Sequence, residues 1–356
     1  MSSGFLRFSR QTLLGAVATG IVYARNLLVM PLLTKGLGAA GYGVWVQLFV
    51  GIELVAGLVI LGFNFSLLRY VPQRETRRDE LDDLVSALLV GLSVALVGQI
   101  VLISTSDWIA ATLLGDPDLT GTVRRAGWVV PFAASGLLIL SYLRGSRRVT
   151  FFVLCVSLET GTWLAVVGYL FQAGAGLEEM ILGLLLIKSI VVFAALLVLL
   201  KGRVLFPTFS HVGSYLRHGI PLLPLGILVA TVNASDRYIL GFFQGAEAAG
   251  VYSVSYGLGS IVGLVFAPVF FVLIPATAAS WEKDRLDEVR VYLGFAYKYP
   301  LIVSIPMLFL LTTYSRNLIS AIATPEFYST WMLVAAVGSG IAIMNLGAIV
   351  QTILIL

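Results

Sequence analysis

The sequence has little charge and few side chains that bind metals or carry redox chemistry. It contains one cysteine, Cys155, and two histidines, His211 and His218, in 356 residues. A single cysteine excludes an intrachain disulfide, a cysteine-based zinc site and a cysteine redox pair. Two histidines are too few for a histidine-rich metal site. We therefore expect no metal site.

Charged residues make up only 12% of the chain, whereas hydrophobic residues make up 58%. An average soluble domain is about 25% charged, and a water-soluble fold could not bury this much apolar surface. A polytopic membrane protein can expose it, because lipid does not penalise apolar side chains. The net charge of +4 is too small to indicate a nucleic-acid partner.

Apolar runs of about 20 residues, the length that crosses a bilayer as a helix, recur along the whole chain. All must be helices, because unpaired strand edges in lipid leave backbone groups unsatisfied. We predict ten spans, near Leu13–Leu33, Tyr42–Leu68, Leu84–Ser104, Gly127–Tyr142, Phe151–Phe171, Met180–Leu200, Leu216–Ala234, Val251–Ile274, Tyr292–Thr312 and Trp331–Leu354.

The basic residues are distributed unequally between alternate loops. Most of the 23 lysines and arginines fall in one set of loops, together with the N-terminal segment. The opposite set carries Lys35, Arg124, Arg125, Arg237 and Arg316. Because cytoplasmic loops carry the excess of lysine and arginine, we predict a cell-membrane protein with a cytoplasmic N-terminus.

Two distant segments share a pattern that indicates an internal repeat. Leu33–Trp45 reads LTKGLGAAGYGVW and Ser235–Gly259 reads SDRYILGFFQGAEAAGVYSVSYGLG, with Ala-Ala-Gly in each. Six predicted spans separate the copies, so both copies have the same orientation, and we predict two parallel-repeat lobes around a central cavity. The first is a six-helix lobe over residues 1–205, and the second, over residues 206–356, contains four spans. The chain stops at Leu356 in an apolar run, so we expect the second lobe to be truncated.

Four charged residues fall at similar depths within the predicted spans of the first lobe. They are Arg25, Glu53, Glu159 and Lys188. Charged side chains at bilayer depth are costly and normally face a protein interior or a water-filled cavity. In one interpretation Arg25 and Lys188 attract an anionic group while the carboxylates balance them or carry protons. In the other, Arg25 pairs with Glu53 and Glu159 pairs with Lys188, and the pairs only tie helices together.

In the second lobe, Lys298 lies about 10 Å from the cytoplasmic end of its span, counting 1.5 Å per residue. It either lines the same chamber or extends to the headgroups.

The sequence lacks a nucleotide-binding glycine loop with lysine and a paired His-Glu metal motif. We therefore expect no enzyme, no catalytic residue and no cofactor, with energy supplied by a gradient for which H⁺ or Na⁺ is the candidate coupling ion.

Two segments resemble a known family. Asp236–Gly259 resembles the signature between spans seven and eight of polysaccharide-type flippases, with Asp236, Arg237, Gly241, Gly250 and Tyr252 as its landmarks. Together with Leu32–Leu48, LLTKGLGAAGYGVWVQL, it is similar to the Wzx-like oligosaccharide flippases. These belong to the multidrug/oligosaccharidyl-lipid/polysaccharide exporter superfamily, which also includes the MATE antiporters.

The resemblance implies a flippase that moves a polyprenyl-pyrophosphate-linked oligosaccharide to the outer leaflet by alternating access, for polysaccharide biosynthesis. In such proteins a cationic cavity receives the anionic lipid-linked substrate, and Arg25 and Lys188 are the matching candidates. The expected partners are this substrate, membrane lipids, and the polymerase and glycosyltransferases of the same pathway. One alternative is a MATE-like drug/cation antiporter, in which acidic cavity residues should dominate. Another is a membrane glycan polymerase or ligase, which would normally have a large outer loop bearing arginines, and the outer loops here are short.

Overall fold

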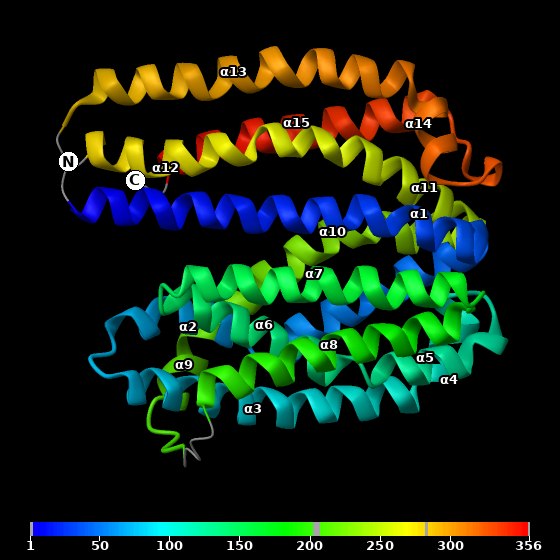
Figure 1. Ribbon diagram of the computed structural model, residues 1–356, viewed down its shortest axis with the longest axis horizontal. Coiled ribbons are helices and arrows are strands. Elements are labelled where there is room, and N and C mark those ends of the chain that lie inside the picture. The colour runs from blue at the N-terminus through cyan, green and yellow to red at the C-terminus, as the bar shows by residue number, and fades with distance from the viewer. Residues whose placement is uncertain (1–2, 202–206, 282–283, 355–356) are drawn as a thin grey trace. The chain divides into compact units, whose positions relative to one another are not determined.

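The computed structural model describes residues 3–201, 207–281 and 284–354, and every regular element in these ranges is a helix (Figure 1). The all-α class predicted from the sequence is confirmed. The chain forms two compact units, each with most of its contacts inside itself: the first ends at Gly250 and the second begins at Val251. The predicted boundary between the repeat lobes, at residues 205 and 206, rests on the repeat pattern and stays a prediction.

The first unit contains α1 (Ser3–Val59), α2 (Phe63–Tyr70), η1 (Val71–Gln73), α3 (Arg77–Ser104), α4 (Ser106–Trp108), η2 (Ile109–Leu113), η3 (Pro117–Leu119), α5 (Thr120–Gly127), α6 (Val130–Gly145), α7 (Val149–Gln172), α8 (Leu177–Leu200), α9 (Val212–Gly219), η4 (Ile220–Leu222) and α10 (Leu223–Gln244). The helix α11 (Ala246–Ser260) crosses from the first unit into the second. The second unit continues with η5 (Ile261–Val265), α12 (Ala267–Trp281), α13 (Leu286–Thr313), α14 (Ser315–Ile322), η6 (Pro325–Phe327) and α15 (Trp331–Leu354).

Eight helices among the described residues are long and apolar enough to cross a membrane, and a bent pair made of Pro117–Gly127 and Val130–Gly145 adds a ninth candidate. The eight are Val17–Val59, Arg77–Ser104, Val149–Gln172, Leu177–Leu200, Val212–Gln244, Ala246–Phe270, Leu286–Thr313 and Trp331–Val350. Much of their apolar surface faces outward. On α3, for example, Leu96, Val97, Ile100 and Val101 are all exposed. Such surfaces need lipid around them, so the chain is a multi-pass membrane protein.

The first of these helices contains two spans. Its apolar part, Val17–Val59, has 43 residues, which is about 65 Å of helix against a hydrocarbon core of about 30 Å. At Gly38 the backbone has φ 66° and ψ 178°, so α1 is kinked there. This region of conformational space is essentially restricted to glycine. Counting the two halves of α1 separately, and the bent pair as one, gives the ten spans predicted from the sequence.

The second copy of the repeat turns in the same way. Gly245 has φ 87° and ψ 168°, close to the values at Gly38. Gly38 stands directly before its Ala-Ala-Gly sequence, whereas two residues separate Gly245 from the second one. The two turns contact each other. A Cβ on Gly43 would overlap the carbonyl oxygen of Ala246, and a Cβ on Gly250 would overlap that of Ala39. Glycine is therefore needed at both positions for the backbones to approach.

The helices of the first unit pack around α6 and α7. The α6 helix contacts α2, α3 and α8, while α7 contacts both α1 and α8. Figure 1 shows the long helices α3, α7 and α8 running along a common direction. This packing places α1, α7 and α8, the three helices that carry the predicted charged residues, against one another.

A buried carboxylate holds α9 to the start of α3. Asp83 is 3% exposed. Its Oδ2 accepts hydrogen bonds from Arg74 Nε at 2.5 Å and from Tyr215 Oη at 2.7 Å, and its Oδ1 lies 3.1 Å from His211 Nδ1. Burial alone would lower the pKa of Arg74, but its hydrogen bonds to Asp83 and Tyr215 and the Asp83 charge outweigh this and raise it. Arg74 is therefore charged at every ordinary pH.

In the second unit, α12, α13 and α15 form a small apolar core. Leu273, Ala296 and Ile349 are buried there, and Tyr297 Oη donates a hydrogen bond to the Leu346 carbonyl oxygen at 3.3 Å. A close contact joins α11 to α15, because a Cβ on Gly259 would lie 3.0 Å from the backbone nitrogen of Gly338.

Candidate functional site

The structure brings the four charged residues of the predicted chamber together in the first unit. The kink at Gly38 returns α1 past itself, so that Arg25 lies on one half of α1 and Glu53 on the other. Glu159 comes from α7 and Lys188 from α8. All four lie within candidate membrane spans.

The four side chains form one chain of ion pairs. Arg25 Nη1 lies 3.4 Å from Glu159 Oε1, Lys188 Nζ lies 3.2 Å from the same oxygen, and Lys188 Nζ also lies 3.1 Å from Glu53 Oε1. The expected pairing of Lys188 with Glu159 is therefore present. Arg25 pairs with Glu159, whereas the second of the two interpretations paired it with Glu53. Glu159 thus holds two cations, and Lys188 bridges the two carboxylates.

The four side chains of this cluster differ in how much of their surface is exposed. The side chains of Arg25, Glu159 and Lys188 are 13%, 14% and 16% exposed, whereas that of Glu53 is 31% exposed. Two cations and two carboxylates balance in charge, which reduces the large cost of keeping ions away from water. Glu53 contacts one cation of the cluster and is its most exposed member.

Aromatic rings cover one side of the cluster. The Arg25 guanidinium lies 5.6 Å from the centre of the Trp163 ring, a cation–π contact. Trp163 meets Trp45 and Phe49 edge to face, with centroids 6.0 and 6.2 Å apart. The sequence analysis missed these rings. Helical spacing could have identified two of these rings. Trp163 is one helical turn after Glu159 and Phe49 is one turn before Glu53, so each ring lies on the same helix face as a cluster carboxylate.

A small cavity opens beside the cluster within the first unit. It has a volume of about 40 Å³ and is lined by Glu159, Lys188 and Cys155, with aliphatic residues of α6 and α8. This volume holds at most a few water molecules. It is far too small for a sugar or a diphosphate, so this cavity is not a substrate chamber.

The signature residues of α10 make a helix–helix contact. Gln47 of α1 donates from Nε2 to the Arg237 carbonyl oxygen at 3.3 Å, and Tyr238 Oη donates to the Gln47 carbonyl oxygen at 2.7 Å. A Cβ on Gly241 would overlap the Gln47 side-chain amide. Asp236 lies 3.5 Å from the Arg237 guanidinium. In this structure these signature residues hold α10 against α1.

The remaining predicted residues lie on other elements. Gly250 is in the turn contact with Ala39, and Tyr252 of α11 lies 5.9 Å from Tyr256, ring centre to ring centre. Lys298 lies on α13 in the second unit, where its side chain is exposed. Its membership of a shared chamber stays a prediction.

The fold is shared with membrane proteins of known structure. The chain is similar to an outward-facing multidrug resistance MATE family transporter of the MOP superfamily, with a TM-score of 0.64 and 13% identity, over 97% of this chain and 79% of that one. It is also similar to a MOP superfamily transporter from Pyrococcus furiosus, with a TM-score of 0.62 and 14% identity, over 96% and 84% of the two chains. At these identities the likeness establishes the fold.

The family follows from the sequence itself. A model of the polysaccharide biosynthesis protein family matches residues 8–281, and the chain belongs to that family. It is 30% identical over 208 residues to the lipid III flippases of Escherichia coli K12 and Shigella flexneri. This match covers 56% of the chain and 48% of each relative. The chain therefore spans about half the length of the curated relatives it matches. These relatives are flippases, not enzymes.

Proposed function

We propose that this protein is a flippase that moves a polyprenyl-pyrophosphate-linked oligosaccharide across the cell membrane by alternating access. One observation carries the proposal: Arg25 and Lys188 are held among membrane spans by ion pairs with Glu53 and Glu159, in a chain of the polysaccharide biosynthesis family. Charged side chains within membrane spans are rare and usually mark a substrate or ion pathway. A lipid-linked diphosphate is the kind of anion that needs them.

The geometry suggests how the cluster takes up such an anion. Lys188 contacts both carboxylates, whereas Glu53 contacts only Lys188 of the two cations in this cluster. A phosphate oxygen could replace Glu53 on Lys188 while Glu159 keeps both cations in place. Protonation of Glu53, or binding of Na⁺ to it, would release Lys188 in the same way. We infer that Glu53 is the member that couples an ion to substrate binding.

The fold also supports a second candidate, a MATE-like antiporter of drugs and cations. The structural neighbours include a MATE multidrug transporter determined in complex with a small molecule. The two candidates differ in the charge of their substrate. A cationic drug would pair with Glu53 and Glu159, whereas a diphosphate would pair with Arg25 and Lys188. The family match favours the second of these pairings.

The test uses the full chain in proteoliposomes that contain a fluorescent lipid-linked oligosaccharide. We expect transfer between leaflets, and we expect Arg25→Ala and Lys188→Ala each to reduce its rate by at least about tenfold, the loss expected for one charge-assisted contact. The matched control is Arg124→Ala, which removes an arginine from an exposed ion pair with Asp107. Transfer at the unchanged rate in both cluster variants, or export of a cationic dye in place of the glycan lipid, would contradict the proposal.

The surrounding pathway follows from the same proposal. Glycosyltransferases would supply the lipid-linked oligosaccharide on the cytoplasmic side, and a polymerase would use it on the other side. Membrane lipids surround the exposed apolar faces of the spans.

A further inference from the structure

A second group of basic residues, none of them a member of the charge cluster, lines a pocket at one end of the spans of the first unit. The pocket has a volume of about 470 Å³. Four cations line it: Arg77 at the start of α3, Arg147 and Arg148 between α6 and α7, and Lys201 after α8. The unequal distribution of basic residues predicts that this end is cytoplasmic.

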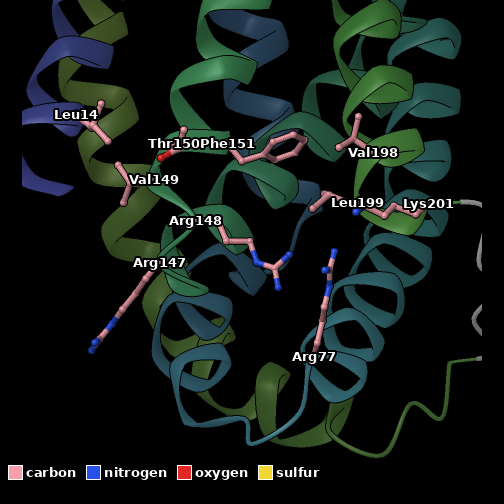
Figure 2. Close-up of a pocket in the computed structure, with 10 residues that line it drawn as sticks. All are labelled: Leu14, Arg77, Arg147, Arg148, Val149, Thr150, Phe151, Val198, Leu199 and Lys201. Carbon is pink, nitrogen blue, oxygen red and sulfur yellow. The ribbon is translucent and has the colours of Figure 1, made fainter. Parts of the chain in front are cut away.

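Three of the cations converge on one space. Figure 2 shows the guanidinium groups of Arg77 and Arg148 pointing toward each other, with Lys201 directed into the same region and Arg147 extending away. Glu80 pairs with Arg148 at 3.0 Å. Among the described residues, no carboxylate lies within ion-pair distance of Arg77 or Lys201, and none lines the pocket. The pocket therefore has a net positive charge.

The beginning of a long helix adds to this positive field. The 24-residue helix α7 starts at Val149, its N-cap is Arg148, and no side chain caps it. The first three residues of α7, Val149 to Phe151, line the pocket. Their N–H groups have no partner within the helix, and the helix dipole is positive at this end. Free N–H groups beside cationic side chains are a suitable arrangement for a phosphate.

The backbone is also unusual here. Lys201 has φ 46° and ψ 42°, the left-handed conformation, at the C-cap of α8. Arg147 has φ 55°. Glycine is the usual residue in this conformation after a helix, because it has no Cβ to clash. At both positions the backbone conformation favours glycine, yet the sequence has a basic residue there.

We propose that this pocket binds the phosphate group of a membrane lipid. The charged groups supply the phosphate contacts, and the apolar side chains of Phe151 and Val198 supply a surface for the lipid chain. Two lipids share this chemistry, an anionic phospholipid of the bilayer and a polyprenyl diphosphate. The site stands whether or not the protein is a flippase, because it uses none of the residues of the charge cluster.

The experiment compares two double variants that remove the same number of positive charges. Arg77→Ala with Lys201→Gly removes two cations from the pocket. Arg78→Ala with Arg144→Ala removes two exposed cations that are close in the sequence but do not line it. Purified protein in detergent is titrated with phosphatidylglycerol, with a polyprenyl diphosphate and with phosphatidylcholine, and bound lipid is counted by native mass spectrometry.

We expect the pocket variant to bind the phosphate lipid about thirtyfold more weakly, the loss expected for two basic residues at an anionic surface, and the control to change less than about twofold. The lipid with the higher affinity identifies the natural source of the phosphate. An equal loss in both variants would mean diffuse surface attraction and would overturn the proposal, as would no loss in the pocket variant.

Lys201→Gly alone separates binding from folding. Glycine adopts the left-handed backbone at no steric cost, so the midpoint of thermal unfolding should stay the same or rise. The affinity for the phosphate lipid should nevertheless fall by about fivefold, the loss expected when one basic residue is removed. Unchanged binding in this well-folded variant would overturn the role of Lys201 in the site.

Discussion

Glu159 is the residue on which the charge cluster depends. It accepts contacts from Arg25 at 3.4 Å and from Lys188 at 3.2 Å, and its side chain is only 14% exposed. Without its charge, two cations would face each other with Glu53 as the single remaining carboxylate. Glu53 is less tightly held, since it contacts one cation and is 31% exposed. The two glutamates should therefore play different parts, one holding the cations in place and the other exchanging with a ligand.

This difference predicts unequal effects of the same substitution. Glu159→Gln should lower the free energy of unfolding by about 3 kcal/mol, because it leaves buried charge uncompensated. Glu53→Gln should lower it by less than about 1 kcal/mol, as for a more solvated pair. The measurement is the midpoint of thermal unfolding of each purified variant in detergent. Equal shifts for the two variants would show that the cluster is held together uniformly.

The sequence could identify the four cluster residues, but of the two pairings it suggested only that of Lys188 with Glu159 is present. Their depth follows from counting residues along each span, because a helix rises by a constant amount per residue. Their partners depend on how each helix is rotated about its axis, and that rotation is set by packing. For the same reason Asp83 could not be distinguished from Asp79, Glu80 and Asp82, which are close neighbours in an acidic stretch.

At the scale of elements, the contact between the chain turns at Gly38 and Gly245 is made by backbone atoms. Gly43 meets the carbonyl oxygen of Ala246, and Gly250 meets that of Ala39, so a side chain at either position would have to displace main chain. The sequence shows the repeated Ala-Ala-Gly but gives no indication that the two copies lie against each other. Its predicted spans at Leu13–Leu33 and Tyr42–Leu68 are found, joined through the kink at Gly38.

We expect Gly43→Ala to destabilise the first unit by about 3 kcal/mol, the upper end of the range for overpacked sites. The matched control is Gly57→Ala on the same helix, where an added Cβ meets nothing within 4 Å. That control should be neutral or stabilising, because alanine favours helix over glycine. Thermal unfolding midpoints of the two variants provide the comparison. A Gly43→Ala protein as stable as the control would mean that the turns do not meet so closely.

At the scale of the whole molecule, composition and the apolar runs predicted the class of protein and the number of its spans. The number of spans follows from the length of apolar runs, because the thickness of the bilayer sets how many residues a span needs. The predicted membrane class and the family are both confirmed. The basic pocket could not be predicted, because its cations come from three separated segments, near residues 77, 147 and 201, that only the fold brings together.

The orientation of the chain in the membrane can be tested on a single helix. The helix α3 has 28 residues from Arg77 to Ser104, about 42 Å at 1.5 Å per residue. Its ends must therefore lie on opposite sides of the bilayer. The excess of basic residues predicts that Arg77 is cytoplasmic and that Asp107, just beyond the far end, is outside.

Cys155 is the only cysteine of the chain and is buried, so Cys155→Ala gives a background without thiols. In that background we expect Asp107→Cys to react in whole cells with a maleimide that does not cross membranes, and Arg77→Cys to react only after the cells are opened. Both positions are exposed, so access to the reagent decides the result. Labelling of Arg77→Cys but not Asp107→Cys in intact cells would reverse the orientation. The phosphate-lipid pocket that contains Arg77 would then face the outer leaflet.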